Sequence, residues 1–122
     1  SYEDHKYLGS DHVRVLFEAL KAEVLGLDPC VTEAILKQYV AFKAETNFVD
    51  VVPQAKRLRL SLNMKLSQLD DPRNIAKDIS EVGRWGNGDV EIGLESLEQL
   101  PYVMSLIRQS FNRQMSLENE ST

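Results

Sequence analysis

The dipeptide Asn87-Gly88 lies between two short runs, 78–82 and 89–94, in which apolar and polar residues alternate. An Asn-Gly pair in this setting is a strong signal for a tight antiparallel hairpin, because both central residues of such a turn need a positive φ. We therefore expect strands at 78–82 and 89–94 that are joined at Asn87-Gly88. The turn would place Arg84 and Trp85, the only tryptophan, where side chains can face a partner.

Three stretches upstream also show the period of two that is typical of strands: 39–43, 47–52 and 57–62. Short connections join them, which predicts a meander. In the third stretch, one face is apolar and the other polar: Leu58, Leu60 and Leu62 against Arg57, Arg59 and Ser61. We expect the apolar face to pack on helices and the polar face to meet solvent or a ligand.

Apolar residues at helical spacing flank these strands at both ends of the chain. Ser10 is a suitable N-cap for the first helix, and Gly26 can end it in a left-handed conformation. Asp28-Pro29 predicts a second, short helical segment that runs from Cys30 to Lys37. The last helix should begin near Leu100, because Pro101 is tolerated only in a first turn.

The order of these elements predicts an α+β fold, with an antiparallel meander of about five strands packed on one face by an N-terminal and a C-terminal helix. Residues 10–115 form one domain in this interpretation. The polar start, 1–9, is expected to be a linker-like tail, and 116–122 a frayed end. Because the sequence begins with Ser1 instead of methionine, we expect a domain of a longer protein.

The composition favours an ordinary globular domain in the cytoplasm. The chain has 122 residues, of which 43% are hydrophobic and 27% charged, and no apolar run approaches the roughly 18 residues that a membrane-spanning helix needs. Cys30 is the only cysteine, so no disulfide can form within the chain. We expect no membrane insertion.

The formal net charge of −5 is unevenly distributed. Basic residues exceed acidic ones by three in residues 37–84, whereas acidic residues are in excess by four on each side of that range. Basic and aromatic residues interleave there, as in surfaces that bind nucleic acid. The candidate ligand-binding residues are Lys43, Arg57, Arg59, Arg84 and Trp85, with nucleic acid or a partner protein as ligand. An ordinary solvated surface of mixed charge remains the alternative.

No catalytic constellation stands out in the sequence. Asp70, Asp71 and Asp78 form a candidate acidic site, although they lack the spacing of an EF-hand and suit turn formation. The glycine-rich stretch 83–89 lacks the ending of a P-loop. His5 and His12 are the only histidines, and their spacing gives no metal motif. We therefore expect a non-catalytic domain without a cofactor or a bound metal.

Several motifs together resemble one family: Tyr39-Val40-Ala41-Phe42-Lys43, Asn47-Phe48, Leu69-Asp70-Asp71-Pro72, Gly83-Arg84-Trp85-Gly86-Asn87-Gly88-Asp89 and Leu106-Ile107-Arg108-Gln109-Ser110-Phe111. The chain resembles the small uncharacterised domain at the end of bacterial and archaeal proteins labelled "predicted transport protein". The resemblance covers about 10–115. It implies an accessory or regulatory module that follows a restriction-endonuclease-like or other DNA-linked domain.

A looser similarity of layout, with helices against an antiparallel sheet, is to frataxin-like and YdhG-like iron-handling proteins. By this analogy, Asp4, Asp11, Glu18 and Glu23 would contribute to an acidic ridge that meets a metal ion. The similarity is one of architecture alone. It gives the alternative function.

Overall fold

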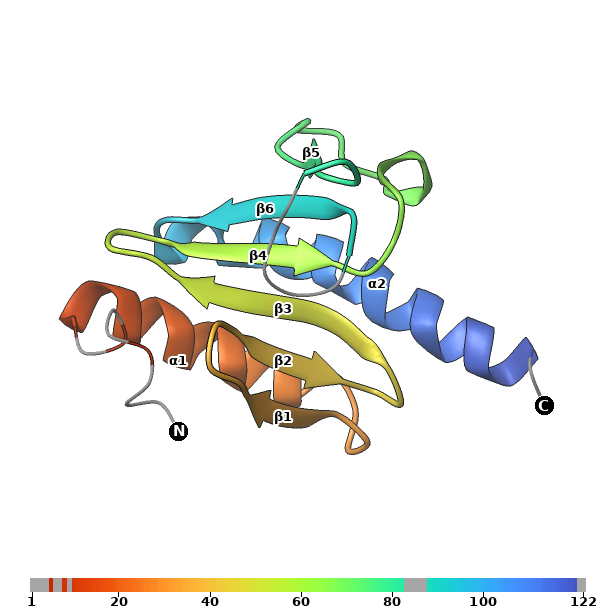
Figure 1. The fold of residues 1–122 in the computed structure, drawn as a ribbon, viewed down its shortest axis with the longest axis horizontal. Helices are drawn as coiled ribbons and strands as arrows, with labels where there is room; N and C mark the ends of the chain where they lie inside the picture. The colour runs from red at the N-terminus through yellow and green to blue at the C-terminus, as the bar shows by residue number, and fades with distance from the viewer. Residues whose placement is uncertain (1–4, 6–7, 9, 83–87, 121–122) are drawn as a thin grey trace.

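The computed structural model describes residues 5, 8, 10–82 and 88–120. The fold is α+β, as predicted, and consists of one antiparallel sheet with two α-helices (Figure 1). The elements in chain order are α1 (Asp11–Leu25), β1 (Thr32–Ile35), β2 (Val40–Lys43), β3 (Asn47–Pro53), β4 (Leu58–Leu62), a 3₁₀ turn (Leu66–Gln68), β5 (Lys77–Asp78), β6 (Val90–Leu94), a second 3₁₀ turn (Leu97–Gln99) and α2 (Leu100–Glu120).

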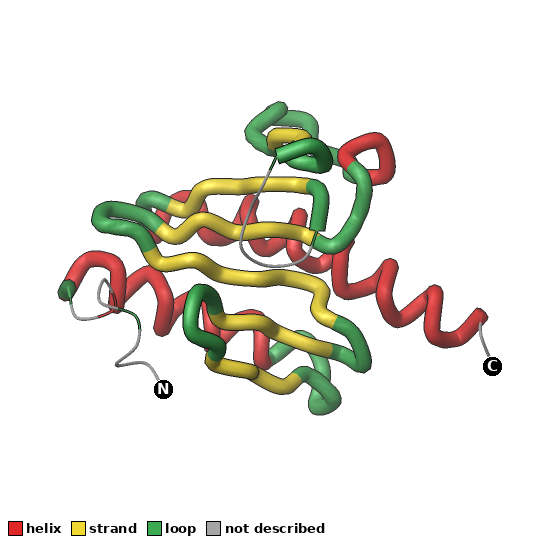
Figure 2. The backbone as a smooth tube through the Cα atoms, viewed as in Figure 1, coloured by secondary structure: helices red, strands yellow, loops and turns green. Residues whose placement is uncertain are grey.

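The sheet has six strands in the order β1-β2-β3-β4-β6-β5. Strands β2, β3 and β4 form the predicted meander, because each pairs with the next through a short connection. After β4 the chain leaves a place free for one strand and forms the two-residue strand β5 at the edge of the sheet. It then returns to form β6 between β4 and β5. Figure 2 shows β5 as a short segment set beyond β6.

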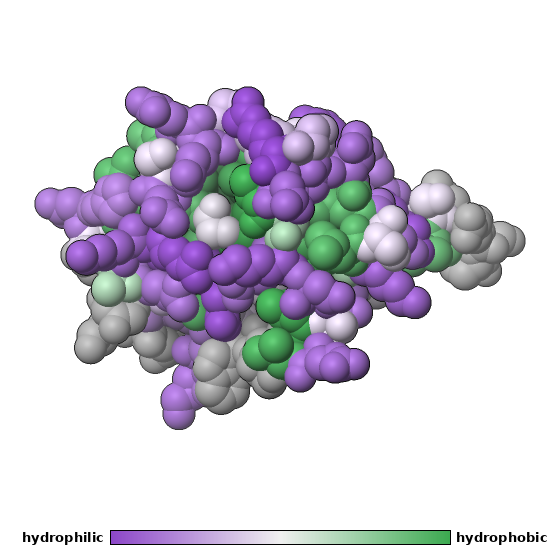
Figure 3. Space-filling view, turned by 90° about the horizontal axis from the view of Figure 1, so that it is seen from above, coloured by the Kyte–Doolittle hydropathy of each residue, from purple (hydrophilic) through white to green (hydrophobic). Residues whose placement is uncertain are grey.

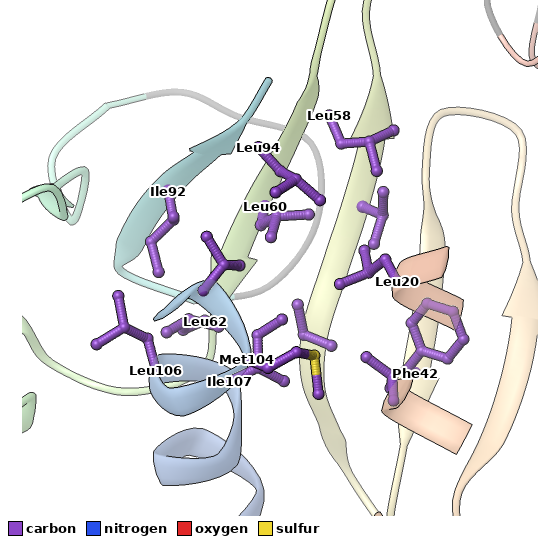
Figure 4. Close-up of a cluster of buried hydrophobic side chains, with 14 of the residues drawn as sticks. Leu20, Phe42, Leu58, Leu60, Leu62, Ile92, Leu94, Met104, Leu106 and Ile107 are labelled. Carbon is purple, nitrogen blue, oxygen red and sulfur yellow. The ribbon is translucent and has the colours of Figure 1, made fainter. Parts of the chain in front are cut away.

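Both helices lie on one face of the sheet and cover its apolar side chains (Figures 1 and 4). The strand residues on this face alternate along each strand and are almost fully buried: Val40, Phe42, Val49, Val51, Leu58, Leu60, Leu62, Val90, Ile92 and Leu94. Complete burial of one such side chain stabilises the fold by roughly 1.5–3 kcal/mol. The α1 stripe of Val13, Leu16, Phe17, Leu20 and Val24 and the α2 residues Val103, Leu106 and Ile107 complete the core.

The helix ends follow the sequence in part. Helix α2 begins at Leu100 as predicted, and Pro101 occupies its first turn, where a missing amide hydrogen costs little. Ser10 precedes α1 but its side chain makes no capping hydrogen bond. The expected left-handed conformation of Gly26 is wrong, since its φ of −76° and ψ of −8° continue the right-handed helix. No helix in the described part of the chain is long and apolar enough to cross a membrane.

The predicted helical segment from Cys30 to Lys37 is wrong, because 32–35 forms strand β1. The carboxylate of Asp28 accepts the Cys30 amide hydrogen at 2.9 Å, which makes the Asp-Pro sequence a turn instead of a helix start. The same bond lowers the pKa of the Asp28 carboxyl. Pairing with β2 along its whole length then favours strand over helix for this β-branched stretch.

The prediction of a tight hairpin at Asn87-Gly88 is also wrong, although the antiparallel pairing of the segments before and after it is correct. Lys77 pairs with Glu91, which places the connection across 79–89, and residues 80–82 form a turn instead of a strand. Asn87 lies outside the described residues. Gly88 has a φ of 120°, and a Cβ atom there would lie 2.2 Å from the Leu62 carbonyl oxygen. This glycine therefore permits a close approach to the end of β4.

Candidate functional site

A pocket of about 360 Å³ opens beside β6, between the sheet edge, the start of α2 and the loop that leads into β5. Its volume lies within the range of ligand-binding clefts. The lining residues come from four parts of the chain: Arg57 before β4, Arg73, Ile75 and Lys77 from the loop and β5, Glu91, Gly93 and Glu95 from β6 and its end, and Gln99, Tyr102 and Val103 from the second 3₁₀ turn and the start of α2. We call it the Arg57 pocket. The surface on the β5 side is mostly hydrophilic, with separate apolar areas (Figure 3).

Tyr102 holds the loop that forms one wall of the pocket. Its hydroxyl donates a hydrogen bond to the Asp71 carboxylate and accepts one from the Arg73 amide at 2.9 Å. The other oxygen of Asp71 accepts the Ala76 amide hydrogen at 2.8 Å. Asn74 lies between these points with a φ of 53°, a conformation that asparagine tolerates better than most residues. One side chain of α2 thus fixes both ends of a tight loop.

The first cation in the pocket, Arg73, stacks on the ring of Tyr102, with its guanidinium carbon 4.4 Å from the ring centre. Such cation–π contacts hold an arginine in place while leaving its N–H groups available. Burial of the phenol, together with its hydrogen bond to Asp71, raises the pKa of Tyr102. The raised pKa extends to higher pH the range over which the hydroxyl stays protonated and keeps its contact with the loop.

The second cation, Arg57, lies across the backbone of Gly93. A Cβ atom on Gly93 would be 2.7 Å from a terminal nitrogen of Arg57, so the absence of a side chain there makes room for the guanidinium. The Nε of Arg57 donates to the Gln54 side chain at 2.7 Å, and a terminal nitrogen lies 4.0 Å from Glu91. The arginine is thus positioned from two sides.

Arg59 shares the carboxylate of Glu91 with Arg57. Its Nε lies 3.9 Å from the nearer Glu91 oxygen, and among the described residues this buried nitrogen has no hydrogen-bond partner. Three cationic and two acidic side chains line the pocket, and Arg59 adds a further positive charge beside Glu91. In a chain of formal net charge −5, this is a local excess of positive charge that suits an anionic group.

The structure separates the predicted ligand-binding residues into two groups. Arg57 and Arg59 meet at Glu91, as their places before and within β4 allow. Lys43 ends β2, pairs with Asn47 across the ladder, and does not line the Arg57 pocket. Arg84 and Trp85 lie outside the described residues. The face of the sheet away from the helices also carries acidic side chains, because Asp50 and Glu91 alternate with the helix-facing residues of their strands.

The three residues of the candidate acidic site, Asp70, Asp71 and Asp78, bond to different parts of the chain. Asp70 bonds through its backbone to the side chain of Gln109, and Asp71 bonds to Tyr102 and Ala76. Asp78 accepts the Ser80 amide hydrogen at 2.9 Å, a backbone bond that lowers the pKa of its carboxyl. All three serve loops and turns in these contacts.

Within residues 5, 8, 10–82 and 88–120, no group of three or more histidine, cysteine, aspartate or glutamate residues is placed to hold a metal ion. His5 and His12 contact backbone carbonyls, those of Leu36 at 2.7 Å and Glu95 at 3.0 Å respectively. Asp4 of the acidic ridge lies outside the described residues, and the ridge residues of α1 that are described, Asp11, Glu18 and Glu23, are exposed.

Sequence reasoning missed most of the pocket. Arg73, Lys77, Glu91 and Tyr102 were not among the candidate residues, although Arg73 follows the Asp-Asp-Pro turn that the sequence does reveal. Their convergence depends on the packing of the loop against α2, for which the local pattern carries no signal. The position of Tyr102 directly after Pro101, in a first helical turn, was the one available hint of an exposed anchor.

Comparison with known proteins identifies the family. Residues 3–114 match the family described as "Domain of unknown function (DUF5655)", and the chain belongs to it. An "Uncharacterized protein" of Haemophilus influenzae (strain ATCC 51907 / DSM 11121 / KW20 / Rd) is 43% identical over 107 residues, which is 88% of this chain. The chain spans 35% of the length of that curated relative. No solved structure matches the chain.

Proposed function

We propose that this chain is a non-catalytic binding or regulatory domain that holds an acidic segment of a partner protein in the Arg57 pocket. The observation that carries the proposal is the convergence of Arg57, Arg73 and Lys77, from three separate parts of the chain, around one concave site. Arginines that are held by stacking or by neighbouring side chains lose little freedom on binding, which favours affinity for carboxylates.

The chemistry of the lining supports binding more than catalysis. The residues that line the pocket include no histidine, cysteine, serine or threonine, so they do not form a pair of a serine or cysteine nucleophile with a histidine base. Its apolar part includes the exposed side chain of Ile75, which adds surface that a ligand can bury. A charged group and a nearby apolar group on the ligand match this combination.

A protein ligand fits the charge distribution better than nucleic acid. Phosphate backbones bind along extended tracks of Lys and Arg. Here Glu91 and Glu95 stand among the cations of the pocket, and Asp50 lies on the same face of the sheet. A compact pocket with a positive net charge suits a short acidic peptide. The backbone N–H groups of such a peptide can donate hydrogen bonds to the neighbouring glutamates.

The domain is proposed to act within longer proteins, which is supported by the greater length of the Haemophilus relative. The resemblance to a terminal domain of proteins labelled "predicted transport protein" adds the proposal that it is an accessory to DNA-linked or restriction-type activity. The domain content of full-length relatives tests this part. If no neighbouring domain acts on nucleic acid, the DNA-linked part of the proposal is wrong.

The binding proposal is tested by titrating the ¹⁵N-labelled chain with a short peptide of alternating glutamate and valine, and with a short DNA duplex. We expect the peptide to shift the amide signals of 73–77 and 91–95. The double substitution Arg73→Ala and Lys77→Ala should weaken binding by roughly tenfold or more, because each lost charged hydrogen bond is worth about 1.5–3 kcal/mol.

The matched control removes two exposed cations outside the pocket, Arg14→Ala with Arg108→Ala, which carry the same change of net charge. If both double variants weaken binding equally, attraction is a property of net charge and the pocket is not the site. Shifts at the same signals with DNA and none with peptide would replace the protein ligand by nucleic acid.

A further inference from the structure

The edge of the sheet is incomplete beside the Arg57 pocket. Strand β5 consists of Lys77 and Asp78 and pairs only with Glu91 and Val90 of β6. Among the described residues, no strand pairs with the outer side of Ile92–Leu94, the second half of β6. Figures 1 and 2 show β6 extending well beyond its short neighbour.

The backbone groups of Gly93 point toward this open side. In an antiparallel sheet the N–H and C=O of one residue face the same neighbouring strand, and the direction alternates along the chain. The carbonyl of Asp89 accepts the Ile79 amide hydrogen at 2.8 Å, so Asp89 faces the β5 side, and Gly93 shares its direction. Ile92 and Leu94 face β4 instead, opposite Leu60 and Leu58.

The loop before β5 leaves the sheet at the point where it would otherwise pair with Gly93. Continuing the ladder from Lys77 opposite Glu91 would bring Ile75 opposite Gly93. Ile75 nevertheless lies outside β5. The amide of Ala76, which in a continued ladder would point away from β6, is bound by the carboxylate of Asp71, and Tyr102 holds that carboxylate against α2. The gap that results is the Arg57 pocket, which Ile75 and Gly93 both line.

We infer that this gap takes an extended acidic segment of a partner protein as an additional strand, hydrogen-bonded to the backbone of Gly93. The inference rests on the proposed function and gives its binding mode. Strand addition to an exposed edge is a recurring way to bind peptides, because main-chain bonds supply affinity and alternate side chains supply selectivity.

The two sides of the gap determine which side chains the segment should carry. Lys77 pairs with Glu91, and Arg57 contacts Glu91, so these two cations lie on the face away from the helices, whereas Arg73 stacks on Tyr102. Tyr102 and Val103 belong to α2 and lie on the helix side. Since neighbouring side chains of a strand point to opposite faces, the segment should alternate acidic and apolar residues.

Amide hydrogen exchange in the whole chain tests the binding mode. In the free protein, the Gly93 amide should exchange at least roughly tenfold faster than those of Ile92 and Leu94, which pair with β4. Saturation with the glutamate–valine peptide should slow exchange at Gly93 by about tenfold or more and leave the other two unchanged. A peptide with the same side chains but N-methylated at alternate amides should bind at least about tenfold more weakly.

Each other outcome has a definite meaning. If both peptides bind equally well and Gly93 exchange does not change, the segment is held by side chains alone, so strand addition is wrong while the proposed function stands. Slow exchange of Gly93 in the free protein would show that its amide already has a partner, which also overturns the inference.

If neither peptide shifts any pocket signal, both proposals fail. Protection of Gly93 that depends on protein concentration without peptide would identify a second copy as the occupant instead.

Discussion

Tyr102 and Asp71 share a hydrogen bond of 2.5 Å that ties the first turns of α2 to the loop before β5. The bond acts on the loop from outside the sheet, because Asp71 in turn holds the Ala76 amide, which in a continued ladder would point away from β6. The geometry of the pocket therefore depends on a side chain that lies in a helix. Two elements distant in sequence set how far the sheet edge stays open.

Replacement of Tyr102 by Phe should destabilise the fold by about 1 kcal/mol, because it removes the hydroxyl that bonds Asp71 and the Arg73 amide while keeping the ring. Chemical denaturation measures this loss. A cycle with Asp71→Asn tests the pairing. If the two substitutions are strictly additive, the hydroxyl and the carboxylate do not act together, and the loop is held by other contacts.

The same contact predicts a loss of stability at high pH. Burial and the bond to Asp71 raise the pKa of Tyr102 above its usual 10.0, so the folded protein keeps this proton more tightly than the unfolded chain. The stabilisation is complete below pH 10 and disappears as the pH rises through the raised pKa. The difference in denaturation midpoint between the wild type and Tyr102→Phe should therefore shrink above pH 10. A difference that stays constant there would contradict this assignment.

The sequence predicts the layered part of the fold well, for reasons visible in particular residues. Leu58, Leu60 and Leu62 can face only one side of a strand, and a leucine on every second position requires a covering layer. The helical stripe from Val13 to Val24 supplies part of that layer. Such patterns are local and redundant, so an error at one position does not change the result.

The errors arise where a local signal competes with pairing across the sheet. Asp28-Pro29 suits a helix start, yet the stretch that follows gains more by pairing with β2. Asn87-Gly88 suits a tight turn, yet the register of β5 on β6 uses a longer connection, and Gly88 serves a close approach to Leu62. A dipeptide cannot reveal which of these tertiary uses applies.

The site was harder to predict than the fold because its residues share no pattern. Arg57 belongs to an alternating run and was found, whereas Tyr102 lies in a helix and Lys77 in a two-residue strand. Their meeting is set by the loop between them. The sequence suggests that each of these three side chains is exposed. Exposure of single residues does not indicate which of them meet in one site.

Glu91 should limit the affinity of the Arg57 pocket for acidic ligands. It lies near both Arg57 and Arg59 and offsets part of their charge. Glu91→Gln should therefore strengthen binding of the glutamate–valine peptide by roughly twofold to tenfold at low salt. It should also lower the free energy of unfolding, because it removes the negative charge beside the buried Nε of Arg59. Glu98→Gln, an exposed site outside the pocket, is the matched control. Equal gains in affinity from both variants would mean that Glu91 acts only through net charge.

Two glycines that sequence reasoning treated alike should respond differently to alanine. At Gly88 the φ of 120° is unfavourable for any residue with a Cβ, and that atom would meet the Leu62 carbonyl oxygen at 2.2 Å. The backbone strain alone costs about 1–3 kcal/mol, and relief of the contact must shift β4 or the loop. At Gly26 the backbone is right-handed and the nearest atom, the Ala22 carbonyl oxygen, lies at 3.2 Å. Gly26→Ala should change the free energy of unfolding by less than about 1 kcal/mol, because a lower entropy of the unfolded chain offsets the tight contact. Denaturation of the two variants side by side measures the difference, and an equal loss in both would show that the approach of Gly88 to β4 is not a constraint on the fold.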